Sequence, residues 1–559
     1  MAGVLGSLLA ESAARVPERD AVVLDGVRVT YAALDTEANR IARSLRARGV
    51  ARGDRVGLWL PKSHAAVASL WGALKCGAAY VPIDPGAPVA RLATIARDAG
   101  VRALVISPDR AAAAGEALAG LESLRGLWVT APSGAARPEA EPALELDARS
   151  AARVPIVPWS EVEAESAEPP GDPPGSGDLA YVLYTSGSTG VPKGVVHTHA
   201  SALAFIDWAA DVFAMTETDR VSNHAPFHFD LSTFDLFASA KAGAAVYPVP
   251  PRAAMFPSAI AQLYTQERLT VWYETPSALA LLLRHGKLAE RDLAALRVLL
   301  FAGEVMPVAL LTEMMALAPH ARFANLYGPT ETNVCTWHDV TSPPPADRPL
   351  PIGVPCSGDE AWVLDEEQRE VARGESGELW ISGASVMRGY WGDPARTEQT
   401  LRPLNLGGRT ITAYRTGDLV RWSAEGALLF HGRRDHQIKT RGYRVELGEI
   451  ESALHSHPEV AEAVVLPIPD PEIGNRLKAL VVARPRASAA PGAGATAAAA
   501  PAAPFRDSAA IKDHCARTLP RYMVPEFVDF RDALPRTASG KVDRTALAAE
   551  EAAPRKDPE

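Results

Sequence analysis

Between residues 184 and 194 the sequence reads Tyr184-Thr185-Ser186-Gly187-Ser188-Thr189-Gly190-Val191-Pro192-Lys193-Gly194, directly after the apolar run Leu179–Leu183. Glycines allow a backbone to turn tightly and to bring its N–H groups close to an anion. The hydroxyl groups of this stretch add further donors, and Lys193 adds a positive charge. The stretch is not a GxxxxGK[ST] loop, because Lys193 comes three residues after Gly190 and is followed by Gly194. We predict a loop that binds a polyphosphate and follows a buried strand.

Before this loop, short apolar runs alternate with helical patterns. Strands are predicted at Val56–Leu60 and Val101–Ile106. Helices are predicted from the cap Thr30 to Gly49, at His64–Lys75 and near Val89–Arg97. Alternating strands and helices favour parallel sheets, so the predicted fold class is α/β, with the strand order left open.

Two stretches depart from this pattern. Residues 131–178 are rich in Pro, Ala, Glu and Ser, and we predict a surface insertion there. Residues 485–506 are low-complexity Ala, Pro and Gly, which cannot bury enough side-chain area to become ordered. The flanking segments Leu477–Ala483 and Ile511–Leu519 have the patterns of a strand and a helix. The 485–506 stretch is therefore predicted to be a mobile, disordered loop inside a folded unit.

The composition narrows the classes of function. The 559 residues include 57 Lys and Arg against 67 Asp and Glu, and the net charge of −10 argues against bulk binding to nucleic acid or a membrane surface. A hydrophobic content of 47% with 22% charged residues is typical of globular proteins. The four cysteines (Cys76, Cys335, Cys356 and Cys515) form no CxxC pair, so neither a disulfide scaffold nor a zinc site is predicted. The sequence has neither a long apolar run nor a convincing signal peptide, so we expect a cytoplasmic protein with no membrane partner.

Together with further motifs, the phosphate loop resembles the adenylate-forming superfamily of acyl-CoA synthetases, luciferases and the adenylation domains of nonribosomal peptide synthetases. The further motifs are Val29–Leu34, Leu74–Asp84 with Cys76 where alanine is usual, Asn325–Glu331, Gly377–Leu379, Tyr414–Asp418, Gly432–Asp435 and Ser539–Arg544. They favour a free-standing enzyme of the amino-acid-activating branch. The resemblance implies an α/β fold with a large N-terminal domain of layered sheets and helices at 1–433, a small mobile α+β domain at 434–547, and a tail at 548–559. Asp435 is at the position of the family's hinge.

The reaction that the resemblance implies is attack of a carboxylate on the α-phosphate of ATP, which gives an acyl-adenylate and pyrophosphate. Since two anions must meet, the site needs cations and positioned donors more than a general base. Lys541 is the implied catalytic residue, and its ammonium group bridges the substrate carboxylate and the α-phosphate. Glu331 matches the position of the Mg²⁺ ligand, and Thr330 is implied to hold phosphate oxygens.

Further residues are implied to bind ATP. Tyr327 matches the ring that stacks on adenine, and Asp418 and Arg433 match the ribose contacts. The full implied set for ATP is Thr185, Ser186, Gly187, Ser188, Thr189, Gly190, Lys193, Gly303, Glu304, Asn325, Tyr327, Gly328, Asp418 and Arg433.

The acid that is activated is implied by Asp230, in Phe229-Asp230-Leu231-Ser232, where the family's amino-acid enzymes hold the α-ammonium group. The alternative interpretation is an aspartate that complements a helix N-terminus. The implied substrate pocket is lined by Asp230, Leu231, Phe234, Ser277, Leu300, Ala302, Leu326, Val334 and Cys335, with Lys541 completing it. Apart from Asp230 and Lys541 this lining carries no charge, so a small or medium apolar amino acid is expected, because an unpaired buried charge is costly.

The pocket lining and the segment His224–Ser232 resemble those of free-standing prolyl-AMP ligases, which load proline onto a carrier protein. L-Proline is therefore the predicted substrate. Alanine, valine, glycine and cysteine are the alternatives, since an apolar pocket separates near-isosteres by only about 1–3 kcal/mol per methylene group. The chain ends at Glu559 without a carrier module, so the predicted partner is a separate carrier protein with a phosphopantetheine thiol, in the biosynthesis of a secondary metabolite. A small helper protein is the other candidate partner.

The sequence also allows other interpretations. His197 and His199 are two residues apart and do not share a helix face, so we predict structural roles and no metal. An acyl- or aryl-CoA synthetase that uses free coenzyme A is the alternative enzyme, and Asp230 argues against it. A non-catalytic relative that binds a nucleotide or a carrier is the alternative binding module, and Lys541, Glu331 and the phosphate loop argue against it.

Overall fold

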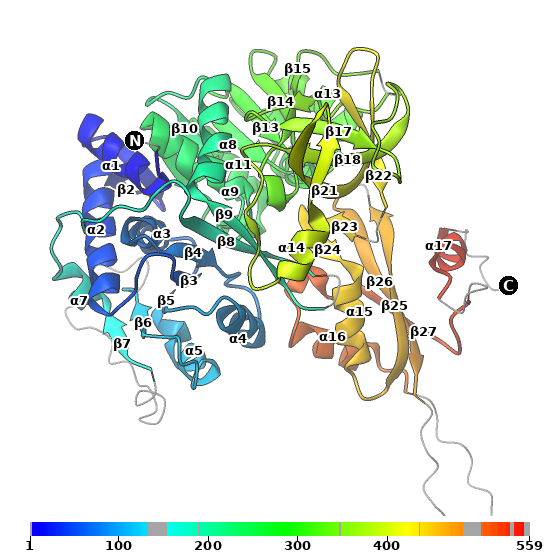
Figure 1. The fold of residues 1–559 in the computed structure, drawn as a ribbon, viewed down its shortest axis with the longest axis horizontal. Coiled ribbons are helices and arrows are strands. Elements are labelled where there is room, and N and C mark those ends of the chain that lie inside the picture. The colour runs from blue at the N-terminus through cyan, green and yellow to red at the C-terminus, as the bar shows by residue number, and fades with distance from the viewer. Residues whose placement is uncertain are drawn as a thin grey trace, which may run out of the picture. The chain divides into compact units, whose positions relative to one another are not determined.

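The computed structural model of the protein describes residues 3–131, 154–187, 190–345, 348–434, 437–470, 472–484, 505–536 and 542–552. The chain divides into two compact units (Figure 1). The larger unit consists of Met1–Pro85, Leu92–Thr185 and Lys193–Asp435, and the smaller unit of Gly86–Arg91, Ser186–Pro192 and His436–Glu559.

An eight-stranded sheet of the larger unit includes the strands on both sides of the predicted phosphate loop. In spatial order its strands are β19 (Gly389–Tyr390), β9 (Lys193–Thr198), β8 (Leu179–Thr185), β4 (Ala79–Pro82), β3 (Arg55–Trp59), β5 (Ala103–Ile106), β6 (Gly126–Val129) and β7 (Ile156–Pro158). The strands from β8 to β7 are parallel, as alternating strands and helices predict. Strand β9 pairs antiparallel with β8, and Thr185 lies opposite Lys193. The predicted phosphate loop is therefore the turn of a β-hairpin.

The helical segments described in the first part of the chain include those predicted at Thr30–Gly49, His64–Lys75 and Val89–Arg97. They are α1 (Leu5–Arg15), α2 (Tyr31–Ala47), α3 (His64–Cys76), α4 (Val89–Asp98), η1 (Pro108–Arg110), α5 (Ala111–Ala117), α7 (Trp159–Glu163) and α8 (His199–Val212). The hydroxyl group of Thr30 accepts a hydrogen bond from the Ala33 N–H at the start of α2. Helix α3 ends at Gly77, whose φ of +86° lies in the left-handed region that favours glycine. The helices predicted in this region are thus confirmed.

Part of the stretch that the sequence predicts to be a surface insertion, 131–178, belongs to the sheet. Residues Ile156–Pro158 pair in parallel with β6, and Val157, Trp159 and Val162 are buried. This apolar segment is short and flanked by prolines, so the surrounding Pro, Glu and Ser residues conceal it. Residues 132–153 lie outside the described part of the chain, as does most of the predicted loop at 485–506.

A nine-stranded sheet forms the second layer of the larger unit. In spatial order its strands are β16 (Val354–Pro355), β15 (Thr336–Val340), β14 (Arg322–Tyr327), β13 (Val298–Phe301), β12 (Val271–Glu274), β10 (Arg220–Asn223), β11 (Ala245–Pro248), β1 (Asp20–Leu24) and β2 (Val27–Thr30). The helical segments of this region are α9 (Leu231–Thr233), the π-helical η2 (Phe234–Ala238), α10 (Ser239–Ala242), η3 (Ala253–Met255), α11 (Pro257–Gln266), α12 (Pro276–His285), η4 (Leu288–Glu290), α13 (Val308–Leu317) and η5 (Thr330–Thr332). Strands β10, β12, β13 and β14 are parallel neighbours. Their carboxyl ends meet at one edge of the sheet, where open α/β sheets bind ligands.

The main apolar core of the larger unit includes buried residues from both large sheets. Leu34 of α2, Val56 of β3 and Tyr181 of β8 belong to one continuous cluster with Leu300 of β13 and Leu326 of β14. Since all five are buried, burial of apolar surface holds the two layers together.

An antiparallel sheet completes the larger unit. Its strands are β17 (Glu360–Leu364), β18 (Ser376–Ser382), β21 (Arg409–Trp422), β20 (Leu401–Leu406) and β22 (Leu428–Arg433), and α14 (Pro394–Thr400) precedes β20. Strand β22 pairs with β21 and places Asp418 opposite Arg433.

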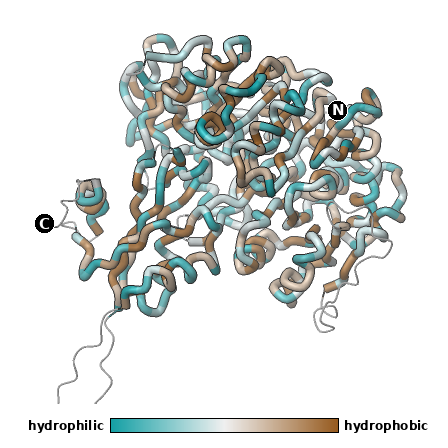
Figure 2. The backbone as a smooth tube through the Cα atoms, turned by 180° about the vertical axis from the view of Figure 1, so that it is seen from behind, coloured by the Kyte–Doolittle hydropathy of each residue, from teal (hydrophilic) through white to brown (hydrophobic). Residues whose placement is uncertain are grey.

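The smaller unit is an α+β structure. Its elements are β23 (Gln437–Thr440), β24 (Tyr443–Glu446), α15 (Leu447–His455), β25 (Val460–Asp470), β26 (Gly474–Ala483), α16 (Ser508–Ala516), η6 (Arg521–Met523), β27 (Phe527–Arg531) and α17 (Arg544–Ala552). Its core contains Ile450, Leu477, Val481 and Cys515, and Figure 2 shows brown hydrophobic stretches interrupted by teal hydrophilic ones along its strands. The strand predicted at Leu477–Ala483 and the helix predicted at Ile511–Leu519 correspond to β26 and α16.

None of the helices in the described ranges is both long and apolar enough to cross a membrane.

Candidate active site

The phosphate loop needs its glycines for steric reasons. A Cβ atom at Gly187 would lie 1.8 Å from the carbonyl oxygen of Val191, so no side chain fits there. The Gly190 N–H donates to the carbonyl of Gly187 at 3.0 Å, and the φ of Gly190 is +84°. These constraints explain why Gly187 and Gly190 are glycines. Ser188 and Thr189, predicted in the same loop, lie outside the described residues.

Lys193 and Glu331 form a buried ion pair. The Lys193 Nζ atom lies 3.2 Å from Oε1 of Glu331, whose side chain is 0% exposed. The hydroxyl of Tyr390 donates to the same oxygen at 2.8 Å, and the Lys193 ammonium lies 5.3 Å from the centroid of the Tyr390 ring. A buried carboxylate with an oxygen held this way has the donor chemistry of a Mg²⁺ ligand, so Glu331 fits the predicted role. Tyr390 was not predicted, because its position in the sequence gives no indication of this contact.

The turn that carries Thr330 and Glu331 is fixed by His197. The Nε2–H of His197 donates to the carbonyl of Thr330 at 2.9 Å, and its Nδ1 accepts from the Asn333 side chain at 3.2 Å. Burial lowers the pKa of His197 to about 4, so the ring is neutral near pH 7. His197 therefore has the structural role that the sequence predicts, and it supports a predicted catalytic turn. Within the described residues, no group of three or more His, Cys, Asp or Glu side chains is placed to hold a metal.

Asp418, Tyr327 and Arg433, which the sequence predicts to hold adenosine, lie together. The hydroxyl of Tyr327 donates to Oδ2 of Asp418. Arg433 donates to Oδ1 of Asp418 at 2.6 Å and to the carbonyl of Thr416 at 3.2 Å. Burial and then the Asp418 carboxylate raise the pKa of Tyr327, which keeps this phenol protonated. Hydrogen bonds join these three side chains into one set, the adenosine cluster, whose binding of adenosine stays a prediction.

Other predicted nucleotide residues contact the scaffold. The Asn325 side chain, within β14, donates to the carbonyl of Pro351 at 2.8 Å. Glu304, which follows Gly303 with a φ of +91°, accepts two hydrogen bonds from Ser277, at 2.8 Å from its N–H and 2.5 Å from its hydroxyl. Glu304, predicted to bind ATP, and Ser277, predicted to line the amino-acid pocket, are thus hydrogen-bonded to each other. They lie in the segments that follow the neighbouring strands β13 and β12.

The apolar residues predicted to select the substrate form part of one core. They are all buried in the cluster that joins the two large sheets, namely Leu231, Phe234, Leu300, Ala302, Leu326 and Val334. Cys335 is also buried, but it belongs to a separate cluster with Ile352 and Leu379, and its thiol donates to the carbonyl of Tyr327 at 3.6 Å. Cys335 therefore contacts the backbone of Tyr327, whereas the other six side chains pack in the apolar core that joins the two large sheets.

Asp230 lies next to this apolar group, immediately before helix α9. Burial, followed by the nearby Asp230 carboxylate, raises the pKa values of Tyr181 and Tyr273, two buried side chains of the same core. Within the described chain the Asp230 side chain does not cap α9 with a hydrogen bond. Asp230 directly precedes α9, so the alternative interpretation, an aspartate that complements a helix N-terminus, stays open beside the predicted binding of an α-ammonium group.

The loop that leads to Asp230 is held by buried polar groups that the sequence did not indicate. The ammonium of Lys62 donates to the carbonyls of Asn223 and His224, at 2.6 and 2.9 Å, where β10 ends. His224 donates through Nδ1 to Glu274 at 2.7 Å, and the Asn223 amide donates to the buried Asp235 at 2.9 Å. Burial lowers the pKa of Lys62 to about 7. No sequence motif indicates these contacts, because they join segments far apart in the chain.

Two predicted residues of the reaction, Lys541 and Asp435, lie outside the described ranges and remain predictions.

Comparison with known proteins identifies the family of the chain. The AMP-binding enzyme family matches residues 9–391, and the AMP-binding enzyme C-terminal domain matches residues 449–541. The chain belongs to the AMP-binding enzyme family.

Two named relatives and one solved structure are similar to this chain over most of its length. The chain is 38% identical over 554 residues to an L-proline–[L-prolyl-carrier protein] ligase of Pseudomonas fluorescens, which covers 98% of this chain and 99% of that protein. A Streptomyces coelicolor protein of the same name is 38% identical over 530 residues, covering 93% of this chain and 91% of that protein. The solved structure of the amide bond synthetase McbA from Marinactinospora thermotolerans matches with a TM-score of 0.78 at 24% identity, covering 98% and 99% of the two chains. This last likeness supports the adenylate-forming fold.

Proposed function

We propose that the protein activates L-proline with ATP and transfers the prolyl group to the thiol of a separate carrier protein. The observation that carries the proposal is the presence, in one unit, of the predicted adenosine cluster at Asp418 and of Asp230 beside a group of buried apolar side chains. Two relatives that align over nearly the whole chain are named for the same activity.

The first step joins the amino acid to AMP. An oxygen of the proline carboxylate attacks the α-phosphorus of ATP, the bond from that phosphorus to the β-phosphate oxygen breaks, and pyrophosphate leaves. Lys193 and Lys541 supply positive charge where charge develops on the phosphates. Glu331 would hold Mg²⁺, which supplies further neutralisation of the phosphate charge when bound.

The amino acid is recognised by one charge and an apolar wall. Asp230 pairs with the α-ammonium group, and buried side chains such as Phe234, Leu300 and Leu326 contact the ring. An acidic or basic side chain has no partner among the apolar residues of this pocket, so its burial is costly. These features support a small apolar amino acid and disfavour benzoates and fatty acids, which have no ammonium group.

The second step moves the acyl group. The phosphopantetheine thiol of the carrier loses its proton and attacks the carbonyl carbon of prolyl-AMP, and AMP leaves with the electrons of the broken C–O bond. A rotation of the smaller unit about Asp435, which withdraws Lys541 and admits the thiol, belongs to the proposal. So does a cytoplasmic location. It agrees with the four free, buried cysteines of the described chain, since disulfides are rare in that compartment.

Carrier loading tests the proposal. The protein is incubated with ATP, Mg²⁺, proline and either a phosphopantetheinylated carrier or free coenzyme A, and thioesters are detected by mass spectrometry. We expect prolyl thioester on the carrier and little on free coenzyme A. Lys541→Ala lowers prolyl-AMP formation by at least about 100-fold, whereas Lys512→Ala, whose ammonium binds the Glu526 carbonyl, leaves it unchanged. Equal or faster acylation of free coenzyme A contradicts the carrier assignment.

A further inference from the structure

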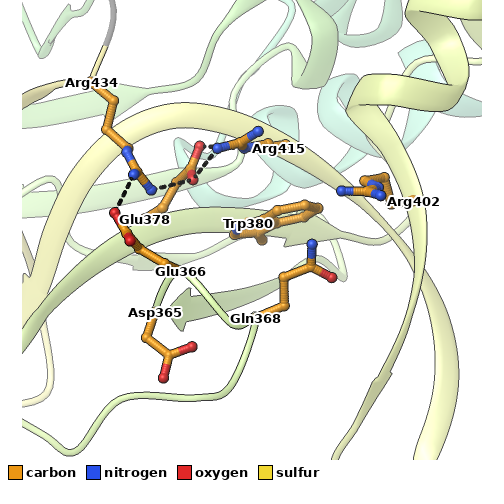
Figure 3. A pocket seen from close by; sticks show the side chains of 8 residues that line it. All are labelled: Asp365, Glu366, Gln368, Glu378, Trp380, Arg402, Arg415 and Arg434. Carbon is orange, nitrogen blue, oxygen red and sulfur yellow. Dashed lines mark hydrogen bonds and ion pairs between the residues drawn. The ribbon is translucent and has the colours of Figure 1, made fainter.

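Three motif residues that the proposed reaction does not use lie around one pocket of the antiparallel sheet. The motifs Gly377–Leu379, Tyr414–Asp418 and Gly432–Asp435 contribute Glu378, Arg415 and Arg434. Figure 3 shows the Glu378 carboxylate between the two guanidinium groups. The pocket is lined by Asp365, Glu366, Gln368, Glu378, Trp380, Arg402, Arg415 and Arg434.

Glu378 is the centre of this cluster. Its side chain is 4% exposed, and it accepts two hydrogen bonds from Arg415, Nε to Oε1 at 2.7 Å and Nη2 to Oε2 at 2.9 Å. Arg434 donates to Oε2 at 3.4 Å and to Glu366 at 2.7 Å. A bidentate arginine–carboxylate pair with a second arginine is stronger and more directional than an ordinary surface ion pair.

The arginines flank the segment that presents Asp418. In the β18–β21 pair, Glu378 lies opposite Leu419 and Trp380 lies opposite Arg415, so residues 416–418 of β21 bulge against Leu379 alone. The Thr416 hydroxyl donates to the Leu379 carbonyl at 2.7 Å and accepts from the Asp418 N–H at 3.0 Å. A bulge re-aims side chains beside a site, and here it directs Asp418 to Tyr327 and Arg433.

The second arginine holds the same bulge from the neighbouring strand. The Arg434 N–H donates to the Gly417 carbonyl at 3.0 Å. Arg434 directly follows Arg433, which binds Asp418. Glu378 thus contacts the residue before the bulge and the residue after Arg433, without touching the adenosine cluster itself.

We propose that Glu378 is a positioning residue for nucleotide binding, which holds Asp418 and Arg433 in place through Arg415 and Arg434. This inference rests on the proposed function only in that Asp418 and Arg433 bind the ribose of ATP. The proline half of the site is independent of Glu378, because Asp230 follows β10 in a different sheet.

The test compares Glu378→Gln with Glu360→Gln, a matched control. Glu360 also pairs with an arginine of β21, Arg409, but these side chains are 41% and 54% exposed, against 4% for Glu378. The KM values for ATP and proline are measured by pyrophosphate exchange, and ATP affinity is measured by titration calorimetry. We expect Glu378→Gln to raise the KM and Kd for ATP about tenfold and to leave the KM for proline within about twofold. We expect Glu360→Gln to change none of these values.

A second substitution keeps the test informative if Glu378→Gln does not fold. Arg434→Gln removes only the longer of the two ion pairs to Glu378, 3.4 Å against 2.7 Å for Arg415, and is expected to raise the KM for ATP about threefold. The double variant Glu378→Gln/Arg415→Gln is expected to bind ATP no worse than Glu378→Gln alone, because both changes break the same pair.

Asp418→Ala separates the two possible failures. If it weakens ATP binding while the Glu378 and Arg434 variants do not, the positioning role is wrong and the nucleotide site stands. If Asp418→Ala leaves ATP binding unchanged, the proposed nucleotide site fails and the inference fails with it. An equal rise of both KM values in Glu378→Gln also contradicts the inference, since it indicates a general loss of structure.

Discussion

Asp418 and Asp230 are both carboxylates of the candidate site, and their surroundings differ. Asp418 accepts hydrogen bonds from Tyr327 and Arg433, and Glu378 braces the bulge behind it. Asp230 lies beside a core of leucine, alanine and phenylalanine side chains. The nucleotide half is thus organised by polar pairs between strands, and the amino-acid half by apolar packing with one charge. The first arrangement suits a substrate that does not vary, and the second sets which amino acid fits.

The largest expected effect comes from a substitution that disrupts only the amino-acid half of the site. Asp230→Ala removes the partner of the α-ammonium group, and we expect kcat/KM for proline to fall by at least about 100-fold, because a buried charge is left unpaired. Asp418→Ala is the matched change in the nucleotide half, and it is expected to raise the KM for ATP with a smaller effect on the KM for proline. Pyrophosphate exchange at varied ATP and proline concentrations measures both. A rise of the ATP and proline KM values together in each variant would show that the two halves are not separable.

A smaller effect is expected from a substitution in the predicted apolar lining of the amino-acid half. Ala302 is 5% exposed at the end of β13, and Ala302→Val adds two methyl groups to the predicted lining. We expect kcat/KM for proline to fall about tenfold, and that for glycine to fall less, because overfilling penalises the larger substrate. The change is compared with Ala321→Val, which lies against the other core of the second sheet. Unchanged selectivity between proline and glycine in Ala302→Val would show that Ala302 does not line the pocket.

The smallest expected effect concerns the support of the Thr330 turn. His197 has a pKa lowered to about 4 by burial, whereas in the unfolded chain it titrates near its ordinary value of 6.5. The unfolded state therefore binds more protons between these values, so the stability contribution is complete above pH 6.5 and is lost as pH falls towards 4. This contribution is at most about 3 kcal/mol.

Thermal unfolding at pH 7 and pH 5 tests this dependence. In His197→Gln the fall in Tm between the two pH values should be smaller than in the unchanged protein, and in a variant of the exposed His320, His320→Gln, it should be the same. An equal fall in all three proteins would show that His197 does not contribute to acid sensitivity.

Local signals predicted much of the fold of the larger unit, whereas the site residues were implied by the family resemblance and stay predictions. The hydroxyl and glycine pattern at 184–194 predicts the loop between Thr185 and Lys193, and the Thr30 cap predicts the start of α2. Such features depend on neighbouring residues, so the sequence alone contains them. Tyr327, Asp418 and Arg433 were predicted from separate motifs, and the structure joins them.

Contacts between distant segments could not be predicted. Tyr390 and His197 support the Thr330–Glu331 turn from other strands, and Lys62 supports the loop before Asp230. No spacing rule links these residues in one sequence. The strand at Ile156–Pro158 was missed for another reason, since three residues are too few to show a period against a Pro-rich background.

Pyrophosphate exchange with every proteinogenic amino acid, a benzoate and a fatty acid tests the central claim most directly. We predict ATP-dependent exchange with proline among the best substrates, weak exchange with other small apolar amino acids, and none with the benzoate or the fatty acid. Exchange driven by the benzoate or the fatty acid instead of amino acids would contradict the assignment of Asp230. Exchange with amino acids, but with proline not among the best substrates, would contradict the predicted lining of the substrate pocket.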